Sequence, residues 1–186
     1  MYCPKESRTA GMYHKYQRKL ADEILNYGLK NMFDIDGTRK IIEKGKYGKP
    51  YLKGMEQYQY NISNTDGMVA CALSEVAVGV DVEKKRDFPR NILRKCTSAQ
   101  ETAYILETED EKQKAERFFR LWTLKESYIK MTGEGMRIPL KEVEFCISEK
   151  ETEMNVTEDA DIRCSKEGKF YQKDQRDYWL SLCTRE

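Results

Sequence analysis

Two short stretches of this 186-residue chain carry charged side chains at spacings that could do chemistry. They are GVDVE at residues 79–83 and FFRLWTLKESYIK at residues 118–130. The first is typical of a strand, in which Asp81 and Glu83 alternate with valines and so point to one face. The second is typical of an amphipathic helix, because its apolar residues recur at near-helical spacing. A carboxylate on that helix could meet the two on the strand.

The predicted helix supplies such a carboxylate in Glu126, with Lys125 before it and Lys130 one turn after it. Magnesium prefers oxygen ligands and commonly adds phosphate oxygens of a substrate. Asp81, Glu83 and Glu126 would supply those ligands, and the two lysines would contact the phosphate. The plainer alternative is an i,i+4 ion pair between Glu126 and Lys130, worth about 0.2–0.5 kcal/mol. On spacing alone, the ion pair is the favoured interpretation.

Composition argues against several other classes of protein. The net charge is +1, which gives no global reason to expect a nucleic-acid partner. No apolar run approaches the length of a membrane span, and the first residues lack the apolar core of a signal peptide. One histidine and no CxxC pair among six cysteines argue against a zinc site. The motif GxxxxGK[ST], which marks a P-loop nucleotide site, is missing from the sequence. We therefore expect a cytoplasmic protein with reduced thiols and no nucleic-acid or membrane partner.

The predicted elements follow the order helix, strands, helices, strands. A helix over 13–27, ended by Gly28, precedes strands over 58–63, 68–73 and 77–82, which are expected to form an antiparallel meander with a turn at 64–67. Helices are predicted over 91–95, 98–106 and 110–131, and strands over 143–147, 153–156, 170–172 and 178–183. This order indicates an α+β fold. We expect two α+β lobes, residues 1–75 and 76–186, in one structural unit with the active site between them.

The two charged stretches together resemble the signature of the 4′-phosphopantetheinyl transferase superfamily. In that signature, (V/I)-G-(V/I)-D-x-E is followed about forty residues later by W-x-x-K-E-(S/A)-x-x-K, and the matching residues are Gly79, Asp81, Glu83, Trp122, Lys125, Glu126, Ser127 and Lys130. GKP at residues 48–50 and NIS at residues 61–63 resemble two further elements of the family. The length and these elements favour the surfactin-synthetase-activating (Sfp) type. The resemblance implies a monomer whose two similar α+β lobes are related by a pseudo-twofold axis.

The resemblance also implies a reaction. Coenzyme A would donate its phosphopantetheine group to a serine of an apo acyl or peptidyl carrier protein, releasing adenosine 3′,5′-bisphosphate. Asp81, Glu83 and Glu126 would hold Mg²⁺ with the pyrophosphate of coenzyme A. Glu101 matches the general base proposed for the family, although the capping box that it can form with Ser98 is a structural alternative. Lys130 would stabilise or protonate the leaving oxygen, and Lys125 would line the pyrophosphate.

Further positions match the part of the family's site that holds the nucleotide. These positions are Arg18, Lys49, Pro50 and Ser63, with Lys5 and Arg8 as N-terminal basic contacts. Asn64 stands where the family usually has a histidine that binds the 3′-phosphate. An asparagine donates a neutral hydrogen bond and brings no charge, which predicts weaker or altered binding of coenzyme A. The region after Gly133, including Met136, would face the carrier protein.

Two other functions stay open from the sequence. Asn64 motivates a non-catalytic homologue that binds coenzyme A or a carrier without turnover. Similar acidic clusters also occur in other metal-dependent phosphoryl enzymes, such as phosphatases and nucleases. Retention of both Glu126 and Lys130 argues against a mere binding relic.

Overall fold

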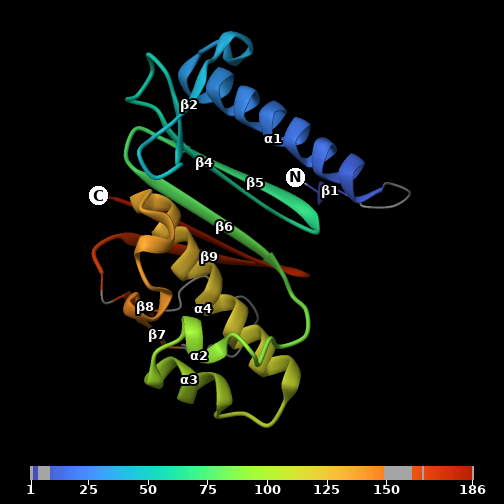
Figure 1. Cartoon of the computed structure of the whole chain (residues 1–186), viewed down its shortest axis with the longest axis vertical. Coiled ribbons are helices and arrows are strands. Elements are labelled where there is room, and N and C mark those ends of the chain that lie inside the picture. Colours follow the sequence, from blue (N-terminus) through green and yellow to red (C-terminus); the bar gives the residue numbers. More distant parts are fainter. Residues whose placement is uncertain (1, 4–8, 149–160, 165, 186) are drawn as a thin grey trace.

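The computed structural model describes residues 2–3, 9–148, 161–164 and 166–185 as a mixture of helices and antiparallel strands (Figure 1). The α-helices are α1 (Ala10–Phe33), α2 (Leu93–Cys96), α3 (Ala99–Leu106) and α4 (Glu111–Thr132). Short 3₁₀ turns are η1 (Gly37–Arg39), η2 (Gly135–Arg137) and η3 (Leu140–Glu142). The strands are β1 (Tyr2–Cys3), β2 (Ile42–Lys44), β3 (Pro50–Leu52), β4 (Gln59–Thr65), β5 (Gly67–Ser74), β6 (Val78–Lys84), β7 (Phe145–Ser148), β8 (Asp161–Cys164), β9 (Lys169–Gln175) and β10 (Tyr178–Thr184). The predicted α+β class is confirmed.

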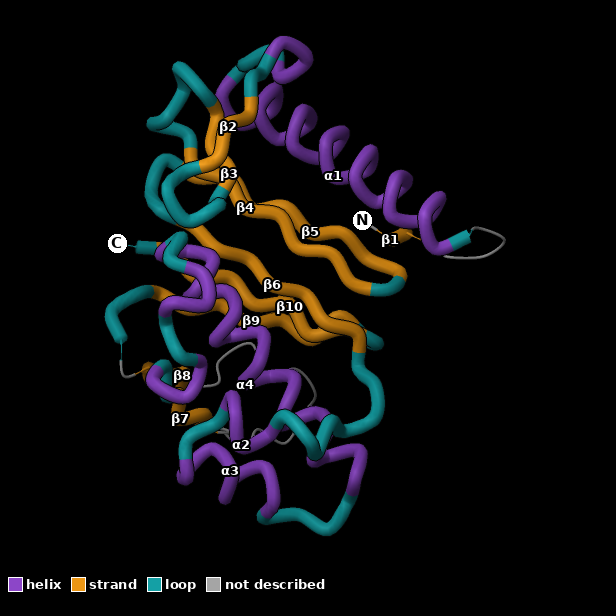
Figure 2. The backbone as a smooth tube through the Cα atoms, in the orientation of Figure 1, coloured by secondary structure: helices purple, strands orange, loops and turns teal. Residues whose placement is uncertain are grey.

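Two three-stranded sheets carry the two long helices. One sheet has the order β1-β5-β4 and the other the order β6-β10-β9, while β2-β3 and β7-β8 form separate pairs. Figure 2 shows these two three-stranded sheets between α1 and α4, with α1 on the side of β4 and β5 and α4 on the side of β6 and β10. The apolar side of α1 packs on β4 and β5, and that of α4 packs on α3, β7 and β10. The apolar side of each long helix therefore fixes the helix against its strands, and with it the polar residues that the helix carries.

The predicted meander of three strands is wrong. The β4–β5 hairpin is present, but β6 pairs with β10 along its whole length. Polar side chains from β4 instead reach the backbone of β6: Asn61, Ser63 and Thr65 accept hydrogen bonds from the N–H groups of Val80, Val82 and Lys84 at 2.9, 3.2 and 3.4 Å. Successive same-face side chains of a strand are two residues apart, so one face of β4 can satisfy alternate amides of β6. Side chains thus join the two sheets where backbone pairing was expected.

The first helix is longer than predicted. It begins after the N-cap Thr9 and runs through Gly28 to Phe33, where Asp34 in a left-handed conformation (φ 55°) ends it. Gly28 lies inside the helix and faces the sheet at close range, because a Cβ there would lie 3.3 Å from the Leu73 side chain. The glycine marks a close contact between helix and sheet, a feature that the sequence does not distinguish from a helix end.

The other predictions of secondary structure hold with small changes of boundary. The capping box of α3 is present, and Gly133 (φ 75°) ends α4 as expected. The predicted strand 153–156 lies outside the described residues, while the strands β1 and β8 and the hairpin of β2 and β3 were not predicted. Among the helices described, none has the length and apolar character needed to cross a membrane.

Candidate active site

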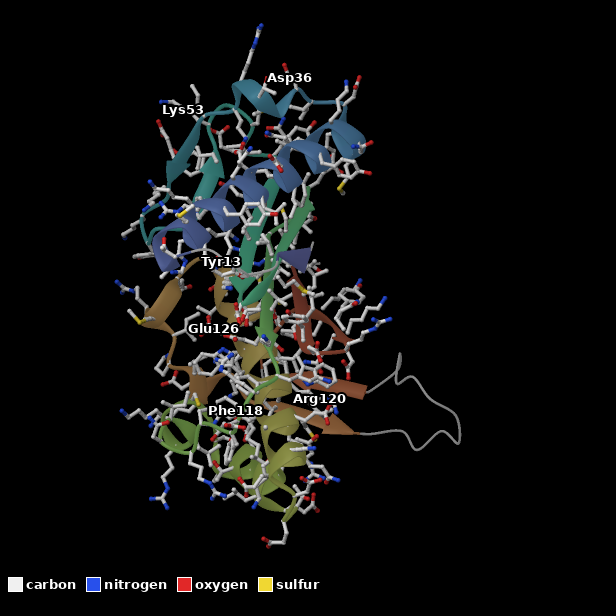
Figure 3. The ribbon with its side chains drawn as sticks, turned by 90° about the vertical axis from the view of Figure 1, so that its right-hand side faces the viewer. Tyr13, Asp36, Lys53, Phe118, Arg120 and Glu126 are labelled. Atoms are coloured by element: carbon white, nitrogen blue, oxygen red, sulfur yellow. The ribbon has the colours of Figure 1, made fainter. Side chains whose placement is uncertain are left out.

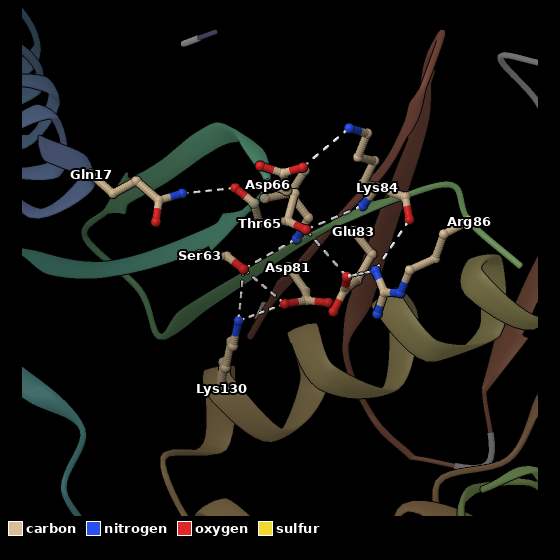
Figure 4. Close-up of polar contacts among 10 residues, drawn as sticks. Gln17, Ser63, Thr65, Asp66, Asp81, Glu83, Lys84, Arg86 and Lys130 are labelled. Atoms are coloured by element: carbon tan, nitrogen blue, oxygen red, sulfur yellow. Dashed lines mark hydrogen bonds and ion pairs between the residues drawn. The ribbon is translucent and has the colours of Figure 1, made fainter. Parts of the chain in front are cut away.

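Asp81 is the centre of a buried polar network between β6, β4 and α4 (Figure 4). Its side chain lies in the core, and its Oδ1 accepts hydrogen bonds from Ser63 Oγ at 2.8 Å and from Lys130 Nζ at 2.6 Å. Lys130 Nζ also donates to Ser63 Oγ at 2.9 Å. The second oxygen, Oδ2, is buried and has no hydrogen-bond partner among the described residues. A buried carboxylate oxygen without a partner is costly, which marks it as a place for a donor or a cation.

Glu83 and Glu126 complete the predicted acidic group. Glu83 Oε2 accepts hydrogen bonds from Arg86 Nη1 at 2.7 Å and from Thr65 Oγ1 at 3.4 Å. Burial raises the pKa of the Glu126 carboxyl, and the negative charges of Asp81 and Glu83 raise it further against the effect of Lys130. The three carboxylates therefore interact electrostatically. As arranged, however, the described part of the chain has no group of three or more Asp, Glu, His or Cys side chains that could hold a metal ion together.

A cleft of about 420 Å³ adjoins this network. Its walls come from residues 47–50, from Asn61 on β4, from Lys95 on α2, from one side of α4 and from the segment 133–140 after that helix. Glu126 and Lys130 line it from α4, and Figure 3 shows Glu126 between the α1 half and the α4 half of the molecule. The structure thus brings together Glu126, Lys130, Lys49 and Pro50 from separate parts of the sequence.

Lys49 reaches from its turn across to the end of α4. Its ammonium donates to the carbonyl oxygens of Val78 at 3.0 Å and Met131 at 2.9 Å. Burial lowers the pKa of Lys49 to about 8, and the charge of Arg185 acts in the same direction. A lysine that lines a cleft and donates to two neutral carbonyl oxygens is well placed to meet an anionic ligand.

Several predicted nucleotide contacts lie elsewhere. Arg18 and Asn64 are exposed and are not among the described residues that line the cleft. The Asn64 amide donates to Gln17 Oε1 at 3.4 Å, which ties it to α1. Ser63 is buried and serves Asp81 directly. Lys5 and Arg8 lie outside the described residues.

The structure does not bring Glu101 and Lys125 to the cleft. Both are 1% exposed, and their side chains form an ion pair of 2.7 Å inside the core. The catalytic role of Glu101 and the pyrophosphate contact of Lys125 stay predictions, and the burial of both groups favours another role. Sequence reasoning also missed Asn61 and Thr65 as partners of β6, although the alternation of polar residues along β4 was the available signal.

Comparison of the sequence with known families shows to which family this chain belongs. Residues 77–183, more than half of the chain, match the sequence model of the 4′-phosphopantetheinyl transferase superfamily. The chain belongs to this superfamily. Both GVDVE and WTLKESYIK fall within the matched residues, so the strand and helix that carry the acidic group are family elements of this 4′-phosphopantetheinyl transferase homologue.

Three relatives confirm the predicted Sfp type. The 4′-phosphopantetheinyl transferase Sfp of Bacillus subtilis is 27% identical over 139 residues, which are 73% of this chain and 62% of the relative. The transferase gsp of Aneurinibacillus migulanus is 32% identical over 139 residues, covering 74% of this chain and 56% of the relative. The transferase psf-1 of Bacillus pumilus is 27% identical over 167 residues, covering 90% and 70%. The chain therefore spans less than two thirds of the first two relatives.

Proposed function

We propose that this protein transfers the 4′-phosphopantetheine group of coenzyme A to a serine of an apo acyl or peptidyl carrier protein, giving the holo carrier and adenosine 3′,5′-bisphosphate. The observation that carries the proposal is the buried Oδ2 of Asp81, which has no hydrogen-bond partner within the described ranges and lies beside a lysine that lines the cleft. A buried polar atom without a hydrogen-bond partner destabilises a fold, so its presence points to a functional role. Membership of the superfamily supplies the reaction class that fits it.

The chemistry of the three carboxylates suits Mg²⁺, although as arranged among the described residues they form no group that would hold the ion. Asp81, Glu83 and Glu126 offer hard oxygen ligands, and their mutual repulsion would be relieved by a divalent cation. Bound there, the ion would polarise a phosphoryl oxygen and neutralise the charge of the leaving phosphate. In our proposal these three residues are the metal ligands.

The residues of the chain itself would bind and orient the donor. Lys130 is held beside Asp81 and lines the cleft, so its ammonium can contact a pyrophosphate oxygen and protonate the leaving group. Ser63 fixes both partners of that ion pair through its hydroxyl. Lys49 and Pro50 would hold the nucleotide end of coenzyme A on the opposite wall. Further nucleotide contacts from Arg18 and Asn64 are proposed on the resemblance alone.

We also propose that the chain acts as a monomer with two lobes, residues 1–75 and 76–186, related by a pseudo-twofold axis. In support, each part places one long helix on a set of antiparallel strands, α1 on β4 and β5 and α4 on β6 and β10. The cleft is lined from both parts, with residues 47–50 from the first and the end of α4 from the second. The active site would then lie between the lobes.

A mass measurement on the carrier tests the proposal. The protein is incubated with coenzyme A, magnesium and a panel of apo carrier proteins, and a gain of one phosphopantetheine group is expected on at least one carrier. Asp81→Asn should abolish the gain, while the matched change of an exposed neighbour, Asp87→Asn, should leave it intact. Wild-type protein that modifies no carrier would contradict the proposal. Binding of coenzyme A by calorimetry without transfer would instead support the non-catalytic alternative.

A further inference from the structure

Lys125 is a fully buried lysine whose three donor positions all have acceptors. Its ammonium donates to the carbonyl oxygens of Leu140 at 2.9 Å and Val143 at 2.6 Å, and it pairs with Glu101 Oε2 at 2.7 Å. An ammonium carries three N–H groups, so these three contacts occupy all of its hydrogen-bond donors. Burial lowers the pKa of Lys125, and the bond and charge of Glu101 oppose that shift. Nothing in this geometry leaves a donor for a substrate.

Glu101 is equally occupied. Its Oε2 also accepts from the backbone N–H of Ser98 at 2.8 Å, as the second half of the capping box of α3. Its Oε1 accepts from the backbone N–H of Phe145 at 2.9 Å, at the start of β7. The pair Lys125–Glu101 therefore joins four segments: α3, α4, the turn η3 and the strand β7.

The segment held by Lys125 is a wall of the cleft. Between the end of α4 and β7, it contributes six residues to the lining: Gly133, Gly135, Met136, Ile138, Pro139 and Leu140. It consists of two single 3₁₀ turns, which carry few backbone hydrogen bonds of their own. Arg137 lies over the ring of Tyr47 at 4.9 Å, on the opposite wall. The position of this wall therefore depends on contacts from outside the segment, and Lys125 makes two of them.

We propose that the Lys125–Glu101 pair is a positioning device that fixes the segment 133–143 as one wall of the cleft, and that neither residue touches the substrate. The proposal rests on the proposed function, because it assumes that coenzyme A or the carrier uses this cleft. Two buried charges survive together only when every remaining donor and acceptor is satisfied, as it is for this pair. Removing one partner leaves an unpaired charge and frees carbonyl or amide groups in the same segment, which should then open locally.

Limited proteolysis tests the positioning role without any assay of activity. Arg137 and Lys141 are exposed trypsin sites inside the segment, and Lys53 is an exposed reference site on the other half of the molecule. In Lys125→Met, cleavage after Arg137 and Lys141 relative to Lys53 should rise about tenfold or more, as expected when a buried polar group loses its partner. The isosteric Glu101→Gln should act in the same direction and serves if Lys125→Met does not fold. Lys112→Met, the same change at an exposed position of α4, should cleave like the wild type.

Kinetics on an active preparation give the second readout. Both variants should raise KM for coenzyme A or for the carrier by a larger factor than they lower kcat, because the wall binds and does not react. Unchanged cleavage of the segment in both variants would overturn the proposal. A loss of kcat in Glu101→Gln with unchanged KM and unchanged cleavage would also overturn it and would restore Glu101 as the general base. If the wild type shows no transfer at all, the proposed function fails while the proteolysis result still decides the positioning role.

Discussion

Gly79 is the residue at which one added methyl group should do the most damage. A Cβ at this position would lie 2.0 Å from the carbonyl oxygen of Ser127, 2.3 Å from the amide nitrogen of Met131 and 2.9 Å from the carbonyl carbon of Lys130. All three atoms belong to the backbone of α4, so no side chain can rotate away to make room. Gly79→Ala therefore requires α4 to move off β6.

The expected cost follows from that geometry. Inserting a methyl group into a packed core costs about 1–3 kcal/mol and occasionally more, and rigid backbone places this site at the upper end. A loss of about 3 kcal/mol would lower the melting temperature by about 6–12 °C in a chain of this size. Urea unfolding followed by circular dichroism measures the free energy of unfolding directly. Because α4 carries Glu126 and Lys130, the shift should also disturb the candidate active site.

A matched glycine gives the control. Gly11, near the start of α1, has open space where a Cβ would go, and alanine favours a helix over glycine by up to about 1 kcal/mol. Gly11→Ala should therefore leave stability unchanged or raise it. A change of less than about 0.5 kcal/mol for Gly79→Ala, the usual range for surface substitutions, would refute the packing argument.

Three further predictions concern charge, capping and thiols. The pKa of Glu126 is raised in the folded chain, so this carboxyl stays protonated to a higher pH in the folded chain than in the unfolded chain. Its contribution to the free energy of unfolding therefore falls as the pH rises from the unfolded-state pKa through the folded-state pKa. Glu126→Gln should therefore be more stable than the wild type at neutral pH and lose this advantage at acid pH, as measured by urea midpoints. Ser98→Ala should cost about 1 kcal/mol in the same assay, because Ser98 is the side-chain N-cap of α3. Exposed Cys146 should react with iodoacetamide much faster than buried Cys96 and Cys183, whose pKa values burial raises to about 11 and about 12.

Each of these has a result that would count against it. A stability advantage of Glu126→Gln that is equal at acid and neutral pH would show that burial of charge is not the cause. Ser98→Ala with no measurable loss would mean that the capping box is replaced by water. Equal labelling of the three cysteines in the native state, read by peptide mass spectrometry, would contradict the burial of two of them. Labelling in denaturant, where all three should react alike, is the control.

Local signals in the sequence determined the elements that carry the site. Alternation of carboxylates and valines identified β6, and the capping box identified the start of α3, because both patterns are properties of neighbouring residues. The matched motif of glycine, carboxylates and lysines identified the superfamily for the same reason. Gly28 misled, because a glycine at the end of a helix and a glycine at a close helix–sheet contact look alike in sequence.

Partners that are distant in sequence were decided only by the tertiary structure. The strand β6 pairs with β10, roughly a hundred residues later, and not with the adjacent β4–β5 hairpin, because hydrogen bonding across a sheet depends on which strand edges meet. Glu101 and Lys125 carry charges that suggest catalysis in the sequence, yet packing closed the core around them and gave each a full set of partners. Asp81 is also a buried carboxylate, but one of its oxygens, near the cleft, has no hydrogen-bond partner in the part of the chain that the structure describes. Residue types set what chemistry is possible here, and burial with its hydrogen-bond partners decided which residues are free to perform it.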